Sequence, residues 1–230
     1  MSKKKIDHTE ARIESVENAL SKTEQYIEEN QKSLTIIVVA IAVIVGGYLG
    51  YKKLYLAPTE NEAQKQMFVA EQYFEKDSFN LALQGDGSNL GFLDIIDEYG
   101  ITKSANLAHY YAGISYLHLG QFENAIEYLK KFDVNDKLVS SVALGAIGDA
   151  YVELGKLDEG TDFYIKAADH NKNDFTSAIY LMKAGLVYEK QGNYDKALEV
   201  YQKIKKDYPQ SDEARDISKY ITEIKIKLNT

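Results

Sequence analysis

Cysteine is absent from the sequence, and only two prolines occur among its 230 residues. Without cysteine the chain cannot form disulfide bonds, use a thiolate nucleophile or bind metal through sulfur, and its redox compartment stays undetermined. With so little proline and 15 glycines, disorder does not dominate the chain. A basic surplus is missing as well, because the net charge is −8. This charge argues against a nucleic-acid partner, since polyanion binding requires clustered lysine and arginine.

A catalytic or metal-binding arrangement is also missing. The histidines have no partners at the spacing of metal ligands or catalytic triads, and we assign structural roles to His109 and His118. Aspartate and glutamate are scattered over polar faces and do not pair beside an apolar pocket. We therefore predict that the chain is not an enzyme and uses no cofactor, metal or small-molecule substrate.

One long apolar run is present, over residues 33–51 (SLTIIVVAIAVIVGGYLGY), with no charged side chain between Lys32 and Lys52. As an α-helix it would be about 28 Å long at 1.5 Å per residue, which is close to the thickness of the hydrocarbon core of a bilayer. A buried core helix would normally keep a polar face, and this run has none. We predict a single transmembrane helix with interfacial tyrosines at its end: Tyr48, Tyr51 and Tyr55.

Lysines flank the span on both sides, so the positive-inside rule does not decide its orientation. A short tail, one span and a large following domain form a signal-anchor layout, which places the carboxyl-terminal domain outside the cytoplasm. The tail, residues 1–32, is too long and too polar for a cleavable signal peptide. Apolar or weakly polar residues recur there at spacings of three and four, as at Val16, Leu20, Thr23 and Ile27. This pattern is typical of an amphipathic helix, for docking or a coiled coil, and a partly disordered tail is the alternative.

The clearest pattern after the span is Ala178–Ser211. With Ala178 as position 1, small residues stand where two helices must approach, and tyrosines stand beside them: Gly185 (8), Tyr188 (11), Tyr194 (17), Ala197 (20) and Tyr201 (24). Gly192 at position 15 permits a tight turn, and Pro209 follows at position 32. This spacing resembles the tetratricopeptide repeat, a pair of antiparallel helices.

The same register recurs upstream, so that repeats are predicted over residues 106–137, 141–172 and 178–211. Gly160 stands where alanine is expected, which predicts a helix loosened by about 1 kcal/mol. Ser211 is predicted to begin a capping helix over 211–228, whose apolar stripe is Ala214, Ile217, Ile221, Ile224 and Leu228. The predicted fold is all-α: a transmembrane helix, then a tetratricopeptide α-solenoid with a terminal capping helix.

A degenerate first repeat is predicted over residues 59–105, after a linker over 52–58. Thr59 and Glu62 have the spacing of a capping box at a helix start, and the turn-rich segment Gly85–Asn89 interrupts the repeat. An alternative is a calcium-binding loop with Asp86, Asp94 and Asp97 among its ligands. It fits less well, because Leu90 occupies a ligand position and the final ligand is not glutamate.

Positions 2, 5, 9 and 12 of the first helix in each repeat line the groove of a tetratricopeptide superhelix. Here they are mostly apolar, which suits an apolar or amphipathic segment of a protein partner. The lysine and asparagine set that clamps a C-terminal carboxylate is missing, since only Lys183 fits it. Alternatively, the chain's own last helix or a second copy covers the stripe. The predicted groove residues are Leu107, Tyr110, Ile114, Leu117, Val142, Val152, Ile179, Met182 and Leu186.

The layout of short tail, single span and repeat domain resembles the YfgM family, ancillary subunits of the SecYEG translocon in bacterial inner membranes. The resemblance implies a periplasmic repeat domain that associates with the Sec translocon and with membrane-anchored periplasmic chaperones, without enzymatic activity. Two other classes are compatible with the same sequence. One is a scaffold for assembly of another cell-envelope complex, and the other is a cytosol-facing receptor of opposite topology.

Overall fold

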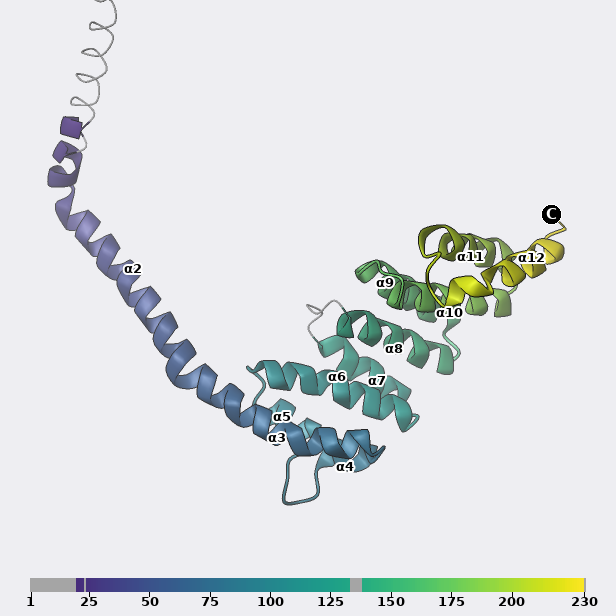
Figure 1. Ribbon diagram of the computed structural model, residues 1–230. Coiled ribbons are helices and arrows are strands. Elements are labelled where there is room, and N and C mark those ends of the chain that lie inside the picture. The colour runs from purple at the N-terminus through teal and green to yellow at the C-terminus, as the bar shows by residue number, and fades with distance from the viewer. Residues whose placement is uncertain (1–19, 23, 133–137, 230) are drawn as a thin grey trace, which may run out of the picture. The chain divides into compact units, whose positions relative to one another are not determined.

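The computed structural model describes residues 20–22, 24–132 and 138–229, and all regular secondary structure within these ranges is helical (Figure 1). The chain divides into two compact units, Met1–Ala57 and Pro58–Thr230. In the first unit the described part of the polar tail, residues 20–22 and 24–29, is helical. The rest of the predicted amphipathic helix lies outside the described residues.

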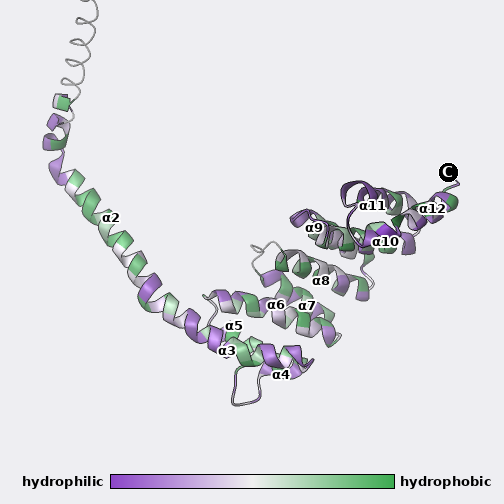
Figure 2. Cartoon of the chain, in the orientation of Figure 1, coloured by the Kyte–Doolittle hydropathy of each residue, from purple (hydrophilic) through white to green (hydrophobic). Residues whose placement is uncertain are grey.

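Helix α2 (Gln31–Tyr51) contains the predicted span, and none of its residues is buried. Large apolar side chains along it are open to the surroundings, with Ile36 exposed by 69%, Val43 by 68% and Ile44 by 70%. Figure 2 shows the nearly unbroken hydrophobic colour of this helix. Within the described residues one helical stretch, Gln31–Glu75, is long and apolar enough to cross a membrane, with a window of mean hydropathy 2.3.

The interval predicted as a linker, residues 52–58, is helical. A π-helical turn, η1 (Lys52–Leu56), follows α2, and helix α3 (Ala57–Glu75) begins directly after it. Pro58 explains the wide turn, because its ring has no N–H for the carbonyl four residues back and would crowd that carbonyl in α-helical geometry. The N–H of Ala57 donates to the carbonyl oxygen of Lys52, five residues back, so the backbone widens just before the proline.

The prediction of a capping box at Thr59 and Glu62 is wrong, since α3 already begins at Ala57. Glu62 therefore lies within the helix, where its carboxylate accepts hydrogen bonds from Lys65 Nζ at 3.2 Å and Gln66 Nε2 at 3.3 Å. The spacing alone could not show this, because the helical turns upstream of Pro58 supply the carbonyl acceptors that a cap would otherwise provide.

Glu60 connects the first turn of α3 to the start of helix α6 (Lys103–His118). Its carboxylate accepts hydrogen bonds from the backbone N–H of Lys103 and from the hydroxyl of Ser104, both at 2.7 Å. A carboxylate is favourable at a helix N-terminus, where it satisfies a free N–H and meets the positive end of the helix dipole. The first turn of α3 is thereby held beside the N-terminus of α6.

Three helix pairs follow in the second unit and stack side by side (Figure 1): α6 with α7 (Phe122–Lys131), α8 (Val139–Glu153) with α9 (Leu157–His170), and α10 (Thr176–Lys190) with α11 (Tyr194–Asp207). We call the first helix of each pair helix A and the second helix B. The turn within each pair has a glycine in the left-handed region, with φ of 71° at Gly120, 73° at Gly155 and 73° at Gly192. A side chain would be strained there, which explains why glycine recurs.

Each helix A presents a glycine to its helix B. A Cβ atom added to Gly113, Gly148 or Gly185 would lie 2.4, 2.6 or 2.2 Å from a large helix-B side chain, which is Leu129, Tyr164 and Tyr201 in turn. Real Cβ atoms do not approach other atoms this closely, so only glycine permits these contacts. The predicted packing of small residues against large ones is confirmed.

Gly160 in α9 lies at a close contact between the two helices of its repeat. A Cβ atom there would lie 2.6 Å from Cγ2 of Val152 and 3.2 Å from the carbonyl oxygen of Gly148. Valine is branched at Cβ and has little rotamer freedom in a helix, so it cannot turn aside easily. Gly160 is therefore required by the close approach of α8 and α9, and the cost of glycine within a helix is offset by that contact.

The first repeat has a divided second helix. Helix α4 (Phe79–Gln84) and helix α5 (Phe92–Glu98) share one buried cluster with α3 and α6, built from Met67, Ala70, Ala82, Leu83, Phe92, Ile95, Ala108 and Ala112. The predicted interruption at Gly85–Asn89 falls between α4 and α5. The cluster therefore forms although helix B is broken, because both halves reach it.

Asp86 organises the loop between α4 and α5. Its carboxylate accepts hydrogen bonds from the Asn89 side chain at 2.9 Å, the Tyr73 hydroxyl at 2.7 Å and the N–H of Ser88 at 2.8 Å. These donors hold the pKa of Asp86 well below its usual range. Asp94 accepts from the N–H of Gly91 at 3.2 Å. The described residues contain no group of three or more potential metal ligands, so nothing in them supports the calcium-loop alternative.

The terminal helix covers the last repeat as predicted. Ile217, Ile221 and Ile224 of α12 (Ile217–Lys227) are buried in the cluster formed with α10 and α11, and Ala214 and Leu228 pack against it. Ser211 differs from the prediction. Its hydroxyl accepts a hydrogen bond at 3.2 Å from the N–H of Ala214 in a short 3₁₀ turn, η2 (Glu213–Arg215), and α12 begins only after that turn.

Candidate partner-binding groove

Eight of the nine predicted groove residues are half-buried, and one is exposed. Tyr110, Ile114 and Leu117 pack against the buried cluster of α7 and α8, whereas Ile179 and Met182 pack against that of α10 and α11. These residues, with Leu107, Val142 and Val152, are half-buried. The side chain of Leu186 is exposed by 46%, more than the other eight.

A pocket of about 520 Å³ brings two of the predicted groove residues together, Leu117 of α6 and Val152 of α8. Three polar side chains share its lining: Asp149, Glu153 and Tyr164. The α6–α7 turn completes it through His118, Gly120 and Phe122. The pocket thus combines an apolar wall with carboxylates from α8.

A second pocket, of about 240 Å³, contains the predicted residue Leu107 beside Met67, Glu71, Glu60 and Lys103. Burial, with the nearby charge of Glu75, raises the pKa of Glu71 above its ordinary value. Within the described residues no ion pair involves Glu71 or Glu153. Each of these two pockets therefore combines apolar surface with a glutamate that forms no ion pair among the described residues.

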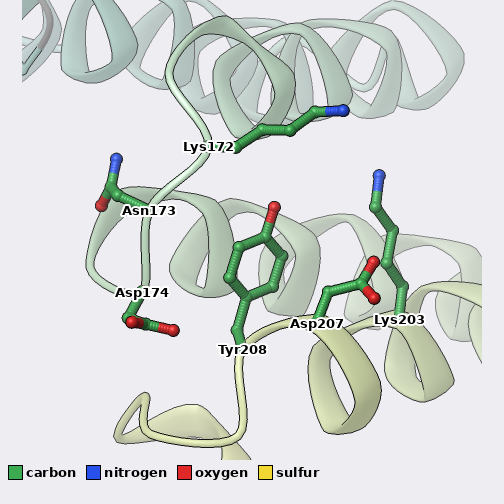
Figure 3. Close-up of a pocket in the computed structure, with 6 residues that line it drawn as sticks. All are labelled: Lys172, Asn173, Asp174, Lys203, Asp207 and Tyr208. Atoms are coloured by element: carbon green, nitrogen blue, oxygen red, sulfur yellow. The ribbon is translucent and has the colours of Figure 1, made fainter.

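A third pocket lies beside the loop that leads into α10. It measures about 330 Å³ and is lined by the loop after α9 and the end of α11 (Figure 3): Lys172, Asn173, Asp174, Lys203, Asp207 and Tyr208. It contains none of the predicted groove residues.

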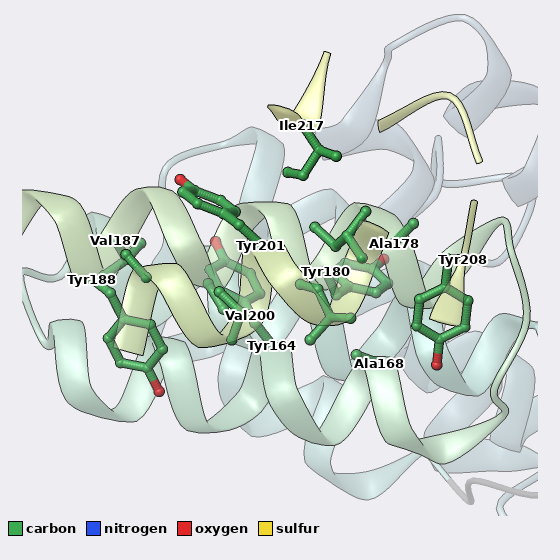
Figure 4. Close-up of a cluster of buried hydrophobic side chains, with 14 of the residues drawn as sticks. Tyr164, Ala168, Ala178, Tyr180, Val187, Tyr188, Val200, Tyr201, Tyr208 and Ile217 are labelled. Atoms are coloured by element: carbon green, nitrogen blue, oxygen red, sulfur yellow. The ribbon is translucent and has the colours of Figure 1, made fainter. Parts of the chain in front are cut away.

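The apolar stripe is interrupted at Gly145, which occupies a groove position on α8. The ring of Tyr180 from α10 lies over it, so that an added Cβ atom would be 1.9 Å from Cε1. Tyr180 is exposed by only 7% and stacks near Tyr164, with ring centroids 6.3 Å apart (Figure 4). Burial, with the charge of Asp149, raises the pKa of Tyr180 above its ordinary value. The chain itself therefore fills the middle of the stripe, between α8 and α10.

A polar junction that the sequence analysis missed lies beside this ring. Asp149 of α8 accepts hydrogen bonds from the hydroxyl of Tyr164 at 2.6 Å and from Lys183 Nζ of α10 at 2.7 and 2.9 Å. Burial and then the Asp149 carboxylate raise the pKa of Tyr164, so its hydroxyl stays protonated and donates. Lys183 is therefore committed to Asp149 and is not free to clamp a partner's carboxylate.

The last repeat contains a similar junction. Glu189 accepts hydrogen bonds from the hydroxyl of Tyr201 at 2.7 Å and from Lys227 Nζ of α12 at 3.0 Å. Tyr164 and Tyr201 occupy the same repeat position, 24, and each hydroxyl meets a carboxylate of its own helix A. The recurrence of tyrosine at position 24 was the sequence signal that could have revealed both junctions.

Replacing Asp149 with alanine is expected to reduce the free energy of unfolding by about 2 kcal/mol, because it leaves a buried hydroxyl and a half-buried ammonium without their acceptor. Asp169→Ala is the matched control. Asp169 also pairs with a lysine, Lys203 at 3.1 Å, but accepts from no buried hydroxyl among the described residues, and its loss should cost only about 0.5 kcal/mol. Urea denaturation followed by circular dichroism measures both. If Asp149→Ala reduced the free energy of unfolding no more than Asp169→Ala, the junction would have no stabilising role of its own.

His109 and His118, for which structural roles were predicted, both have aromatic neighbours. His118 stacks on Phe79, with ring centroids 4.5 Å apart and planes 3° from parallel. His109 lies 5.9 Å from the ring of Tyr128, and burial lowers its pKa, aided by the charge of Lys131. Both belong to the packing of α6 against its neighbours.

Two family models of the tetratricopeptide repeat match the chain, one over residues 107–133 and 180–211 and the other over residues 142–174. The chain therefore contains tetratricopeptide repeats. The matches lie within or beside the predicted repeats 106–137, 141–172 and 178–211. Proteins of this fold are generally non-catalytic scaffolds that bind protein partners. This chain is a protein–protein interaction module.

Solved structures with similar folds include MamA protein, which is 24% identical to this chain, with a TM-score of 0.52 over 72% of this chain and 92% of that one. Another is the set of TPR-like repeats from a protein of Podosopora anserina described as a kinesin light chain. It is 11% identical, with a TM-score of 0.53 over 74% of this chain and 88% of that one. A search of curated proteins found no match. These similarities show a helical solenoid of the tetratricopeptide type.

Proposed function

We propose that the chain is a membrane-anchored accessory subunit of the Sec protein-translocation machinery. In this proposal α2 crosses the bacterial inner membrane once, and the repeats lie in the periplasm, where they link the translocon to periplasmic chaperones. The layout of tail, span and repeats, which resembles the YfgM family, motivates the Sec assignment.

The exposure of α2 is the observation that supports membrane anchoring. Ile36, Val43 and Ile44 are each about two-thirds exposed, and no residue of the helix is buried. Burial of apolar surface stabilises by about 25 cal/mol per Å², and a helix that is apolar on all sides leaves that free energy unused in water. The hydrocarbon core of a bilayer matches both its composition and its length.

The groove supports a particular chemistry of partner. The side chain of Leu186 and the walls of the first two pockets offer apolar contact, and Glu71 and Glu153 add negative charge without a pairing cation among the described residues. Such a surface suits a partner segment that combines apolar with basic side chains. An acidic C-terminal motif is disfavoured, since Lys183 is already paired.

Protease treatment of spheroplasts tests the anchoring and its orientation. The chain should sediment with membranes and resist extraction at alkaline pH, and added protease should digest the repeats while the polar tail stays protected. Digestion only in inverted vesicles would contradict the proposal.

Photo-crosslinking from position 186 in intact cells, with position 199 on the exposed surface of α11 as control, then tests the Sec assignment. Adducts with translocon subunits or periplasmic chaperones are expected from position 186 only. Adducts with another envelope complex would instead indicate an assembly scaffold.

A further inference from the structure

Three exposed apolar side chains recur at one edge of the repeat unit, just before each helix A begins. Ile101 precedes α6, Leu138 precedes α8 and Phe175 precedes α10, and successive members are 37 residues apart. They are exposed by 54%, 53% and 69%. A single exposed apolar residue is ordinary, but here each of three stacked repeats has one within two residues of the start of its helix A. We call these three residues the edge row.

The third pocket lies at the same edge (Figure 3), because the loop that contains Lys172 and Asp174 leads directly into Phe175. Two lysines and two aspartates line it, and one of the lysines, Lys203, also pairs with Asp169 at 3.1 Å. Tyr208 is exposed by only 6%, and its hydroxyl points between Lys172 and Lys203. A pocket of about 330 Å³ that offers both signs of charge suits a zwitterionic group.

The chain also enters the repeat unit at this edge. Glu60 holds the first turn of α3 beside the N-terminus of α6, which directly follows Ile101. Between Tyr51, the last residue of α2, and Pro58, the first of the repeat unit, the chain can span at most about 25 Å even when fully extended. A lipid surface at the end of α2 would therefore lie no farther than this from the residue at which the chain enters the repeat unit.

We infer that the edge row docks on the surface of the membrane, with Ile101, Leu138 and Phe175 inserted among lipid headgroups. The adjacent pocket then holds one zwitterionic headgroup, its phosphate near Lys172 and its cationic end near Asp174 and Asp207. This inference rests on the membrane anchoring proposed above. An anionic surface is disfavoured, because the chain carries a net charge of −8.

Docking leaves free the part of the groove that contains Leu186 and the first pocket. The edge row stands at the start of each helix A, whereas Leu186 and the pocket around Leu117 and Val152 lie toward the other end of the A helices. Contact with lipid through the edge row would therefore fix the orientation of the repeats and present the acidic groove to a partner beside the membrane.

Tryptophan fluorescence tests this inference cleanly, because the native sequence contains no tryptophan. Three single-tryptophan variants of the full chain are reconstituted into phosphatidylcholine vesicles with or without bromine on the acyl chains. Phe175→Trp reports the edge row, Val43→Trp reports α2, and Lys190→Trp reports the exposed opposite end of α10. Brominated lipid is expected to quench Val43→Trp and Phe175→Trp and to leave Lys190→Trp unchanged.

The variants separate failure of the inference from failure of the anchoring. Quenching of Val43→Trp with none at Phe175→Trp overturns edge docking while anchoring stands, and a blue shift of Phe175→Trp without quenching would assign the edge to a protein surface. If Val43→Trp is not quenched, the anchoring itself fails, and the inference fails with it.

In the Phe175→Trp chain, adding Ile101→Ser and Leu138→Ser should weaken quenching, since both side chains are exposed and contribute to insertion. Undiminished quenching would exclude the row as the docking surface.

Discussion

Replacing Gly185 with leucine is expected to reduce the free energy of unfolding of the repeat unit by about 3 kcal/mol, the largest stability effect that we predict. Even a Cβ atom at this position would lie 2.2 Å from Cε1 of Tyr201. Tyr201 is fully buried, and its hydroxyl donates to Glu189 at 2.7 Å, so the ring cannot move without losing packing or that hydrogen bond. The extra volume must therefore separate α10 from α11.

The measurement is urea denaturation of the repeat unit, residues 58–230, followed by circular dichroism. Lys190→Leu is the matched control, since it places the same side chain at an exposed position of the same helix and should change stability by no more than about 0.5 kcal/mol. Should Gly185→Leu unfold at the same urea concentration as the control, the described contact between α10 and α11 would be wrong.

The contacts within each repeat were predictable because they depend on fixed separations along the chain. Gly185 and Tyr201 are 16 residues apart, as are Gly113 and Leu129 and also Gly148 and Tyr164. Because one tight turn joins the two helices of each pair, residues at this separation lie opposite one another. The apolar stripe of α12 was predictable for the same reason, since helical periodicity alone places it on one face. These features required no knowledge of how repeats stack.

The contacts between repeats could not be predicted in this way. Lys183 meets Asp149, Tyr180 covers Gly145, and Glu60 meets the start of α6 only after stacking sets the offset between neighbouring helices. That offset depends on the loops between repeats, which differ in length. For the same reason the sequence predicted a mostly apolar groove but not its interruption, whereas the structure has Tyr180 filling its middle and carboxylates lining its hollows.

Replacing Leu186 with asparagine is expected to weaken partner binding by about 3 kcal/mol, roughly a hundredfold in affinity, through lost apolar burial and an amide without a hydrogen-bonding partner. Leu186 is the most exposed of the predicted groove residues, so the fold should tolerate the change. Asparagine is chosen because it leaves the charge of the acidic groove unchanged. Recovery of the partner from mild detergent measures the effect, and circular dichroism checks that helicity is retained.

Ile226→Asn provides the matched control, since this side chain is exposed by 69% on α12 and is not a predicted groove residue. Equal recovery of the partner with both variants would exclude the groove as the binding surface. A double substitution with glutamate at Ile114 and Met182 cannot decide this, because both side chains pack against buried clusters and a carboxylate there would oppose folding directly. Only an exposed groove residue separates binding from folding, and Leu186 supplies it.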